Sequence, residues 1–212
     1  MRLCLVGMSG IGKSFWAKRL AEARGFQRHD CDGEIGEHLA ELVTPAAGEE
    51  PVHALGRWMG MPWSDGYAAR EARYLELEDR VTHAALDHLA REPGDHVLDT
   101  TGSVVYLGAA PLGRIKELCR IVYLRTPEAM RDAMLRRYLE EPKPVVWGAS
   151  FQPRAGERPE AALPRCYAEL LAFRDERYRL LADVVLDGAA LEAEDPGVDG
   201  FLARCGLGDA PG

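Results

Sequence analysis

The feature that most constrains this chain is the octapeptide Gly7-Met8-Ser9-Gly10-Ile11-Gly12-Lys13-Ser14, which directly follows an apolar run at residues 3–6. A glycine, four residues and then Gly-Lys-Ser form the phosphate-binding P-loop pattern. Glycines let backbone N–H groups converge on a polyphosphate, Lys13 can reach the β- and γ-phosphates, and Ser14 can bind Mg²⁺. The alternative is a glycine-rich turn without a ligand, although such a turn requires neither Lys13 nor Ser14. The pattern predicts a nucleoside triphosphate site formed by Gly7, Ser9, Gly10, Ile11, Gly12, Lys13 and Ser14.

Apolar strands and amphipathic helices alternate along the rest of the chain. The expected strands lie near 2–6, 26–30, 96–98, 121–124 and 184–186, and the expected helices near 13–24, 32–42, 65–89, 111–118, 126–139 and 165–181. Such alternation is typical of a parallel, doubly wound sheet. The prediction is an α/β chain with three layers and a five-stranded parallel sheet.

Length and composition predict one domain over residues 1–212. Residues 140–164 contain five of the 13 prolines and show no periodicity, which is typical of a lid. If the bound triphosphate donates a phosphate group, the molecule that accepts it is expected to bind within residues 32–90. A net charge of −8 argues against a nucleic-acid surface, and no apolar run approaches a membrane span. The five cysteines form no paired spacing, which favours a reduced, cytoplasmic protein. Oligomeric state is not predicted.

Acidic residues follow two of the expected strands. Asp30, Asp32 and Asp99 come where strands end, and the ligands of parallel sheets bind at that edge. One carboxylate can hold a magnesium-bound water, and another can orient or deprotonate an acceptor hydroxyl. Two plainer interpretations compete with these roles, because Asp32 can be a helix N-cap and Asp99 a turn residue.

Arg174 is a charged residue on an apolar helical face. It shares that face with Tyr167, Leu170, Leu171, Tyr178 and Leu181. A buried guanidinium needs a partner, which can be an anionic ligand or a buried carboxylate. The position of Arg174 favours the ligand.

Together these motifs resemble the shikimate kinases, which are small P-loop kinases related to the nucleoside monophosphate kinases. Residues 30–35 resemble the family's D-x-D-x-x-I segment, and residues 98–105 resemble its substrate-contacting loop, with only Gly102 of a glycine triplet retained. Residues 137–146 resemble the lid, and residues 174–183 resemble the R-x-x-x-Y…A-D ending. The resemblance covers most of the chain and implies the three-layer P-loop kinase fold, with a five-stranded parallel sheet and a mobile lid.

The resemblance implies ATP and Mg²⁺ as cofactors and assigns roles to individual residues. It implies that Asp30 serves the metal, with Asp99 supporting it, and that Asp32 contacts the acceptor hydroxyl. Arg137 would stack on adenine, and Lys143 would bring a cation to the phosphates. Gly102 would line the acceptor pocket, and Arg174 would bind an acceptor carboxylate.

Departures from the family lie on the acceptor side. Leu75 occupies the position of a second carboxylate-binding arginine, so we expect Arg70 or Arg73 to substitute, next to Tyr74. Thr101 and Ser103 replace two glycines and should add bulk where a sugar-like ring would lie. The sequence thus predicts an ATP-dependent kinase of a small, hydroxylated, acidic metabolite. The alternatives are a nucleotide, sugar or polyol as acceptor, or a regulatory protein that binds nucleotide and transfers nothing.

Several aromatic side chains have less specific interpretations. Trp58 and Trp63 are expected to be packing residues, although a nucleotide acceptor could use them for base stacking. His29 is expected to be exposed at a strand end, and His83 and His88 to be solvated on the long helix.

Overall fold

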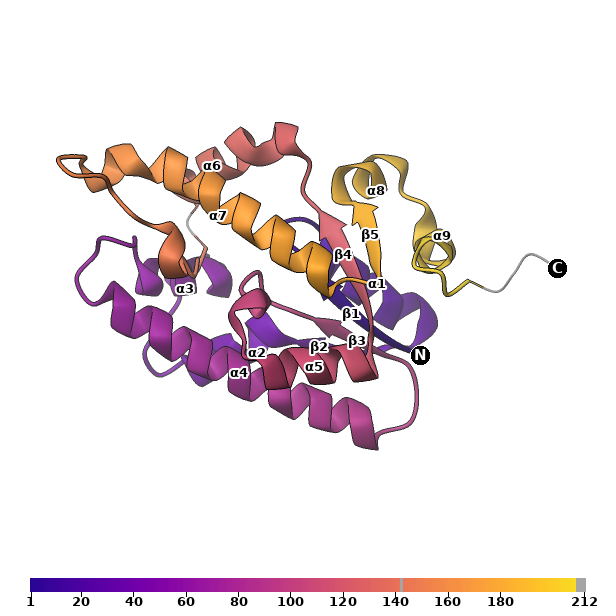
Figure 1. Cartoon of the computed structure of the whole chain (residues 1–212). Coiled ribbons are helices and arrows are strands. Elements are labelled where there is room, and N and C mark those ends of the chain that lie inside the picture. The colour runs from indigo at the N-terminus through magenta and orange to yellow at the C-terminus, as the bar shows by residue number, and fades with distance from the viewer. Residues whose placement is uncertain (142, 209–212) are drawn as a thin grey trace.

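A computed structural model describes residues 1–141 and 143–208 and contains one five-stranded parallel sheet in the order β2-β3-β1-β4-β5 (Figure 1). The strands are β1 (Arg2–Val6), β2 (Gln27–Asp30), β3 (His96–Asp99), β4 (Arg120–Arg125) and β5 (Val184–Asp187). The predicted five-stranded parallel sheet is therefore confirmed. The central strand β1 pairs with β3 on one side and β4 on the other. Its carboxyl end lies at the crevice where such sheets bind ligands.

Helices cover both faces of the sheet and complete the three layers. Leu3 and Leu5 of β1 point into an apolar cluster with α1 (Lys13–Arg24) and α9 (Gly197–Arg204), close to α8 (Gly188–Glu194). Cys4 and Val6 alternate with them and point into the larger cluster on the other face. That cluster includes residues of α2 (Cys31–His38), α3 (Pro51–Met59), α4 (Tyr67–Arg91), α5 (Ala109–Leu118), α6 (Arg131–Glu140) and α7 (Pro159–Leu181).

Helix boundaries differ from the prediction in four places. Between the helices expected near 32–42 and 65–89 lies a further helix, α3, which Pro51 begins with its fixed φ and which buries Leu55 and Met59. Helix α7 begins at Pro159, about two turns earlier than expected, and Pro164 lies inside it. Helix α2 ends at His38 rather than near 42, and two short helices, α8 and α9, follow the last strand.

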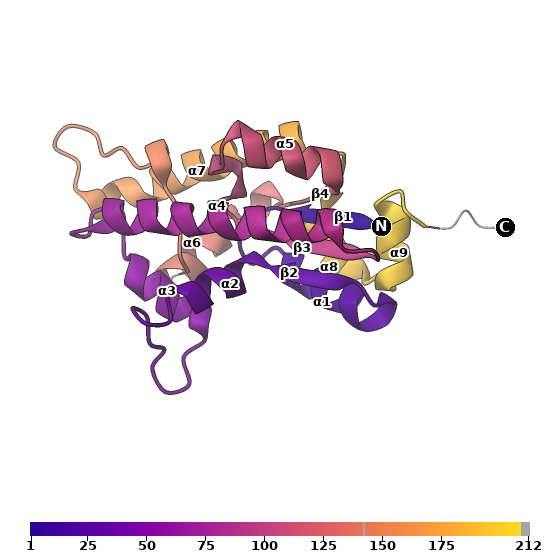
Figure 2. The same ribbon diagram turned by 90° about the horizontal axis from the view of Figure 1, so that it is seen from below.

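The long helix α4 forms one wall of the molecule. Figure 2 shows it extending along the domain, with α5 beside one flank and α2 and α3 beside the other. Its buried face includes Tyr74, Leu77, Val81 and Ala85, as the periodicity predicts. Tyr74 and Glu78 from this face reach the carboxyl edge of the sheet, so α4 contributes to the candidate site.

The five cysteines of the chain lie in its interior. Cys4, Cys31, Cys119, Cys166 and Cys205 are all buried and free. Burial raises the pKa of the Cys31 thiol well above its ordinary value, and the neighbouring Asp32 raises it further, which disfavours a nucleophilic thiolate.

Within residues 1–141 and 143–208, none of the helices is both long enough and apolar enough to cross a membrane.

Candidate active site

The loop between β1 and α1 has a backbone that its glycines make possible. Gly7, Gly10 and Gly12 have φ values of 146°, 81° and 98°, which residues other than glycine rarely adopt. A Cβ added at Gly7 would lie 2.6 Å from the carbonyl oxygen of Leu124 in β4. Gly12 is the N-cap of α1 and has no side chain to satisfy the first N–H groups of that helix. The loop therefore ends in a helix N-terminus suited to an anion.

Lys13 places a buried positive charge over this loop. Its Nζ donates to the carbonyl oxygens of Gly7 and Met8 at 2.9 and 3.1 Å, and the residue is 5% exposed. Burial lowers the pKa of Lys13, while the charges of Asp99 and Asp32 oppose that shift. Among the described residues no carboxylate lies within ion-pair distance of Nζ. The charge is therefore available to a phosphate.

Two adjoining cavities meet at the loop. The larger, of about 920 Å³, is lined by P-loop residues, α2 and α3, and includes Lys13, Ser14 and Asp30. The narrower, of about 70 Å³, includes Ile11, Tyr74, Gly102, Arg137 and Arg174. Residues that line both cavities are Ser9, Gly10, Asp32, Val52 and Lys143. The structure thus gathers most of the sequence-predicted site residues around one junction.

Asp32 lies at this junction and accepts a hydrogen bond from the Tyr74 hydroxyl at 2.9 Å. Burial raises the pKa of Asp32 above its ordinary value, although Lys13 and the Tyr74 hydrogen bond lower it. A carboxylate with a raised pKa is a stronger base, which suits proton transfer from a hydroxyl. The alternative interpretation of Asp32 as an N-cap is wrong, because Asp30 caps α2 by accepting from the Gly33 N–H at 3.1 Å.

Arg28 is a site residue that the sequence reasoning missed. Its guanidinium lies 2.8 Å from the Asp30 carboxylate and 2.6 Å from that of Asp99. Asp99 is 2% exposed and lines neither cavity, so the structure does not support the expected metal role for it. Ser14 and Asp30 remain as oxygen donors on the larger cavity, and oxygen donors suit Mg²⁺. The alternation of Arg28 and Asp30 along β2 is the signal that could have revealed the pair.

Arg174 is the buried cation of the narrower cavity. It is 3% exposed, and one Nη donates to the Val146 carbonyl oxygen at 2.6 Å. The guanidinium lies 5.3 Å from the centre of the Tyr106 ring, and its buried Nε has no hydrogen-bond partner among the described residues. No carboxylate in the described part of the chain lies within ion-pair distance of Arg174. Of the two predicted partners, a buried acid is therefore not found.

The two arginines expected to replace the missing family arginine point elsewhere. Arg70 Nε donates to the Met59 carbonyl oxygen at 3.0 Å, which ties α4 to the end of α3. Arg73 is exposed and pairs with Glu76 at 2.7 Å. Neither arginine lines either of the two cavities at the P-loop, so their positions do not support the expectation that they bind substrate. Tyr74 is buried on the inner face of α4, whereas Arg73, about 100° away around the helix, is turned to solvent.

The predicted lid region is packed against α4 and α7. Trp147 is buried, and its backbone N–H donates to Glu71 Oε1 at 2.6 Å, as does that of Gly148 at 3.0 Å. The Tyr67 hydroxyl donates to the Val145 carbonyl oxygen at 2.7 Å. These bonds hold Lys143 at the junction of the cavities. Residue 142, within the predicted lid, lies outside the described residues.

Trp58 and Trp63, which were expected to be packing residues, take structural positions. Both are partly buried against the larger apolar cluster, and Trp63 lies 5.5 Å from the Phe151 ring. Neither lines a cavity, which supports the packing interpretation.

Comparison with solved structures identifies the fold. A shikimate kinase from Acinetobacter baumannii in complex with shikimate aligns with a TM-score of 0.61 and 22% identity, covering 96% of this chain and 93% of that one. The chain has a shikimate kinase-like P-loop kinase fold. A shikimate kinase from Bacteroides thetaiotaomicron aligns with a TM-score of 0.61 and 19% identity over 98% of this chain and 99% of that one.

A further similar structure widens the range of functions on this fold. The tunicamycin resistance protein of Deinococcus radiodurans aligns with a TM-score of 0.51 and 17% identity over 100% of this chain and 98% of that one. No family model matches the chain, and no curated protein matches it in sequence. At these identities the likeness shows the fold, and the activity must be argued from the site.

The shikimate kinase-like fold contains an unusual acid beside the narrow cavity. Glu78 is 1% exposed and accepts hydrogen bonds from the hydroxyls of Thr101 and Ser103, the latter at 2.6 Å. The two hydroxyls that were expected to alter the acceptor pocket are thus bound to Glu78. Burial raises the pKa of Glu78 to about 7, although both hydrogen bonds lower it.

This pKa predicts a pH-dependent stability. The folded protein holds the Glu78 proton more tightly than an unfolded chain, whose pKa is near 4.5. Stability from this group is therefore complete below pH 4.5 and is lost as pH rises through about 7. The loss should be about 2.5 kcal/mol between pH 5 and pH 8. Urea unfolding should show that Glu78→Gln removes this part of the pH dependence, whereas Glu76→Gln, on an exposed face of α4, keeps it. Identical pH profiles for all three proteins would contradict the prediction.

Proposed function

We propose that the protein is an ATP-dependent phosphotransferase that moves the γ-phosphate to a hydroxyl of a small anionic molecule. The observation that supports this most directly is the narrow cavity beside the P-loop, which Asp32 and Arg174 both line. It pairs a base of raised pKa with a buried cation that has no acid partner among the described residues. A hydroxylated acid would satisfy both groups at once.

The residues present fit ATP and Mg²⁺. The P-loop N–H groups and the N-terminus of α1 can hold phosphate oxygens, and Ser14 and Asp30 offer oxygen ligands on the same cavity. ATP would supply the transferred group, and Mg²⁺ would neutralise charge on its phosphates. Lys13 contributes a fixed cation to the phosphate side, and Lys143, held by the docked lid, contributes a second.

The acceptor half would act through three side chains. Asp32 accepts the proton of the attacking hydroxyl, and Tyr74 holds that carboxylate in place through its 2.9 Å hydrogen bond. Arg174 binds the acidic group of the acceptor and so fixes its orientation. Arg137 lies near Gly10, with Nη1 3.8 Å from a Cβ built there, and is positioned to contact the nucleotide. The lid excludes water, which would otherwise compete with the acceptor.

A panel of acceptors tests this function. ADP release from ATP and Mg²⁺ should be stimulated at least about tenfold by a hydroxy acid, because a bound acceptor completes the site. Shikimate, the ligand of one similar structure, belongs in the panel with other hydroxy acids, sugars, polyols, nucleosides and nucleoside monophosphates. Each active hydroxy acid should be matched with its deoxy analogue as a control.

The outcomes of the panel separate the alternatives. Stimulation by neutral polyols equal to that by hydroxy acids would contradict a role for Arg174. Stimulation by nucleoside monophosphates alone would show that the acceptor is a nucleotide and not a hydroxy acid. Nucleotide binding without stimulation by any compound would favour a protein that binds nucleotide and transfers nothing.

A further inference from the structure

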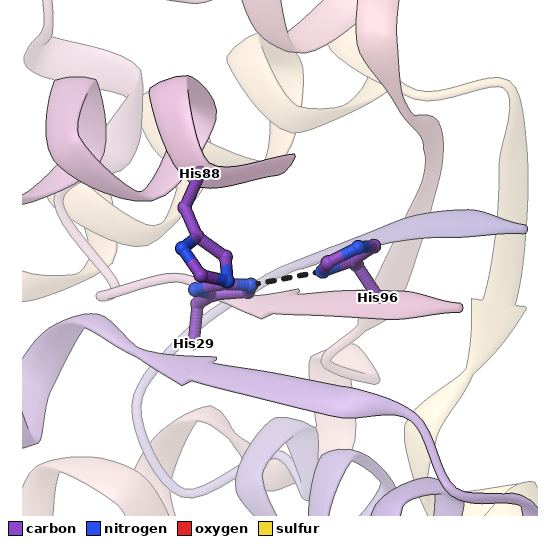
Figure 3. A group of neighbouring side chains, drawn as sticks. All are labelled: His29, His88 and His96. Carbon is purple, nitrogen blue, oxygen red and sulfur yellow. Dashed lines mark hydrogen bonds between the residues drawn. The ribbon is translucent and has the colours of Figure 1, made fainter. Parts of the chain in front are cut away.

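Three histidines outside both cavities meet where β2 and β3 pack against the end of α4. His29 belongs to β2, His96 begins β3, and His88 lies in the last turn of α4 (Figure 3). Each histidine has one ring nitrogen that can bind a metal, and these three nitrogens lie within 4.8 Å of one another. The end of α4, the start of β3 and the distant strand β2 therefore bring three imidazoles together, although His29 was expected to be exposed at a strand end.

The strand pairing explains how two of these rings meet. Gln27 of β2 is paired with His96, and His29 is paired with Leu98, so His29 and His96 are diagonal neighbours on the face toward α4. His29 Nε2 lies 3.2 Å from His96 Nδ1. Two imidazole nitrogens bound to one tetrahedral Zn²⁺ at about 2.0–2.1 Å would be about 3.3 Å apart. The observed spacing already matches that geometry.

The backbone fixes the protonation of the buried ring. His96 is 0% exposed, and its Nε2 lies 3.2 Å from the Glu92 carbonyl oxygen. A carbonyl can only accept, so Nε2 of His96 carries the hydrogen and Nδ1 directs a lone pair at His29. This is the outer hydrogen bond that commonly orients a metal-binding histidine. His29 Nε2 therefore carries the hydrogen of this bond. If that hydrogen moves to Nδ1 of the same ring, the Nε2 lone pair becomes free to bind a metal, and the protein loses no proton.

His88 supplies the third donor and the route of entry. It is exposed, and its ring centre lies 5.2 Å from that of His29 and 5.9 Å from that of His96. Its place in the last turn of α4 favours a cation, because the partial negative charge of the helix is at that end. Gln27 Oε1 lies 3.2 Å from His88 Nε2 and adds an oxygen donor beside the rings.

We propose that His29, His88 and His96 form a binding site for a first-row transition metal ion, of which Zn²⁺ suits the donor set best. Three imidazoles with a fourth position left to water is an established coordination for zinc. None of the three residues lines the cavities of the proposed kinase site, so this site is separate from the Mg²⁺ ligands. An ion there would tie α4 to β2, the strand that ends at Asp30.

Zinc binding by the purified full-length protein tests the proposal directly. After treatment with a chelator, and with excess Mg²⁺ to occupy sites of oxygen ligands, equilibrium dialysis should show one Zn²⁺ per chain. At free Zn²⁺ about 100-fold above Kd, the Tm should rise by roughly 5–10 °C. His88→Ala should weaken binding at least about 100-fold, since losing only an outer-shell partner costs about 10- to 100-fold.

A matched variant and a spectrum complete the experiment. His83→Ala lies on the same helix, outside the cluster, and should bind as the wild type does. Co²⁺ added in place of Zn²⁺ should give the visible absorption of a tetrahedral site in the wild type and in His83→Ala, but not in His88→Ala or His29→Asn. No stoichiometric binding, binding unchanged in His88→Ala, or equal loss in His83→Ala would each overturn the proposal. None of these readouts depends on the proposed kinase activity.

Discussion

Asp32→Asn is expected to reduce turnover by about 10²- to 10⁴-fold while leaving nucleotide affinity within about threefold of the wild type. The amide is nearly the same size as the carboxylate and can still pair with Tyr74, but it cannot accept a proton from an acceptor hydroxyl. Acceptor-dependent ADP release measures turnover, and calorimetry with a non-hydrolysable ATP analogue measures binding. Burial raises the pKa of Asp32. As the pH is lowered, the turnover rate of the wild type should therefore begin to fall at a higher pH than it would with a base of ordinary aspartate pKa.

Glu34→Gln is the matched control for this substitution. Glu34 lies two residues further along α2 and lines neither cavity. The control should retain wild-type turnover and the same acid limb of the pH–rate profile. A folded Asp32→Asn protein with near wild-type turnover would exclude Asp32 as the base. An equal loss of nucleotide affinity would show instead that Asp32 acts through the phosphate or metal site.

The nucleotide half of the site was predictable because local sequence determines it. A glycine that needs positive φ, a lysine and a serine at fixed spacing can be read within eight residues. The strand ends were predictable as well, since continuous apolar runs indicate buried parallel strands. The sequence alone was therefore enough to place Asp30 and Asp32 beside the P-loop.

Other features around the site depend on pairings between elements that are distant in sequence. Arg28 neutralises Asp99 across two adjacent strands, and 71 positions separate them in sequence. Ser103 lines the narrow cavity, as expected of a pocket residue, but Glu78 from a different element binds the hydroxyls of both Thr101 and Ser103. Proximity to Tyr74 along the chain suggested Arg73, although helix geometry turns that side chain to solvent.

The histidine cluster shows the same limit. His29 and His88 each looked solvated when considered alone. The register between β2 and β3, together with the point at which α4 ends, brings them to His96. Register depends on the pairing of whole strands, which the sequence of either strand does not specify.

Arg174→Met is expected to reduce kcat/KM for the acceptor by about 10²- to 10³-fold, with ATP affinity nearly unchanged. The guanidinium is buried, and no carboxylate among the described residues lies within ion-pair distance of it, although the more distant Glu78 favours its charge. An acceptor carboxylate or phosphate would therefore gain a charge-assisted hydrogen bond in a site shielded from water. Losing one partner of such a buried pair costs about 2–5 kcal/mol. The loss should appear mainly as a raised KM for the acceptor, because the P-loop and Lys13 bind the nucleotide without Arg174.

Two further variants distinguish binding from packing. Arg174 also donates to the Val146 carbonyl oxygen, so methionine could loosen the lid. Arg174→Lys keeps the charge and can still reach a carbonyl, but it lacks the planar fork, and it should lose about tenfold rather than 10²- to 10³-fold. Arg177→Met, an exposed arginine on the same helix, should retain wild-type kinetics. Near-UV circular dichroism reports whether the lid aromatics around Trp147 stay packed. If Arg174→Met kept this packing together with a wild-type acceptor KM, the buried cation would be structural and the acceptor need not be acidic.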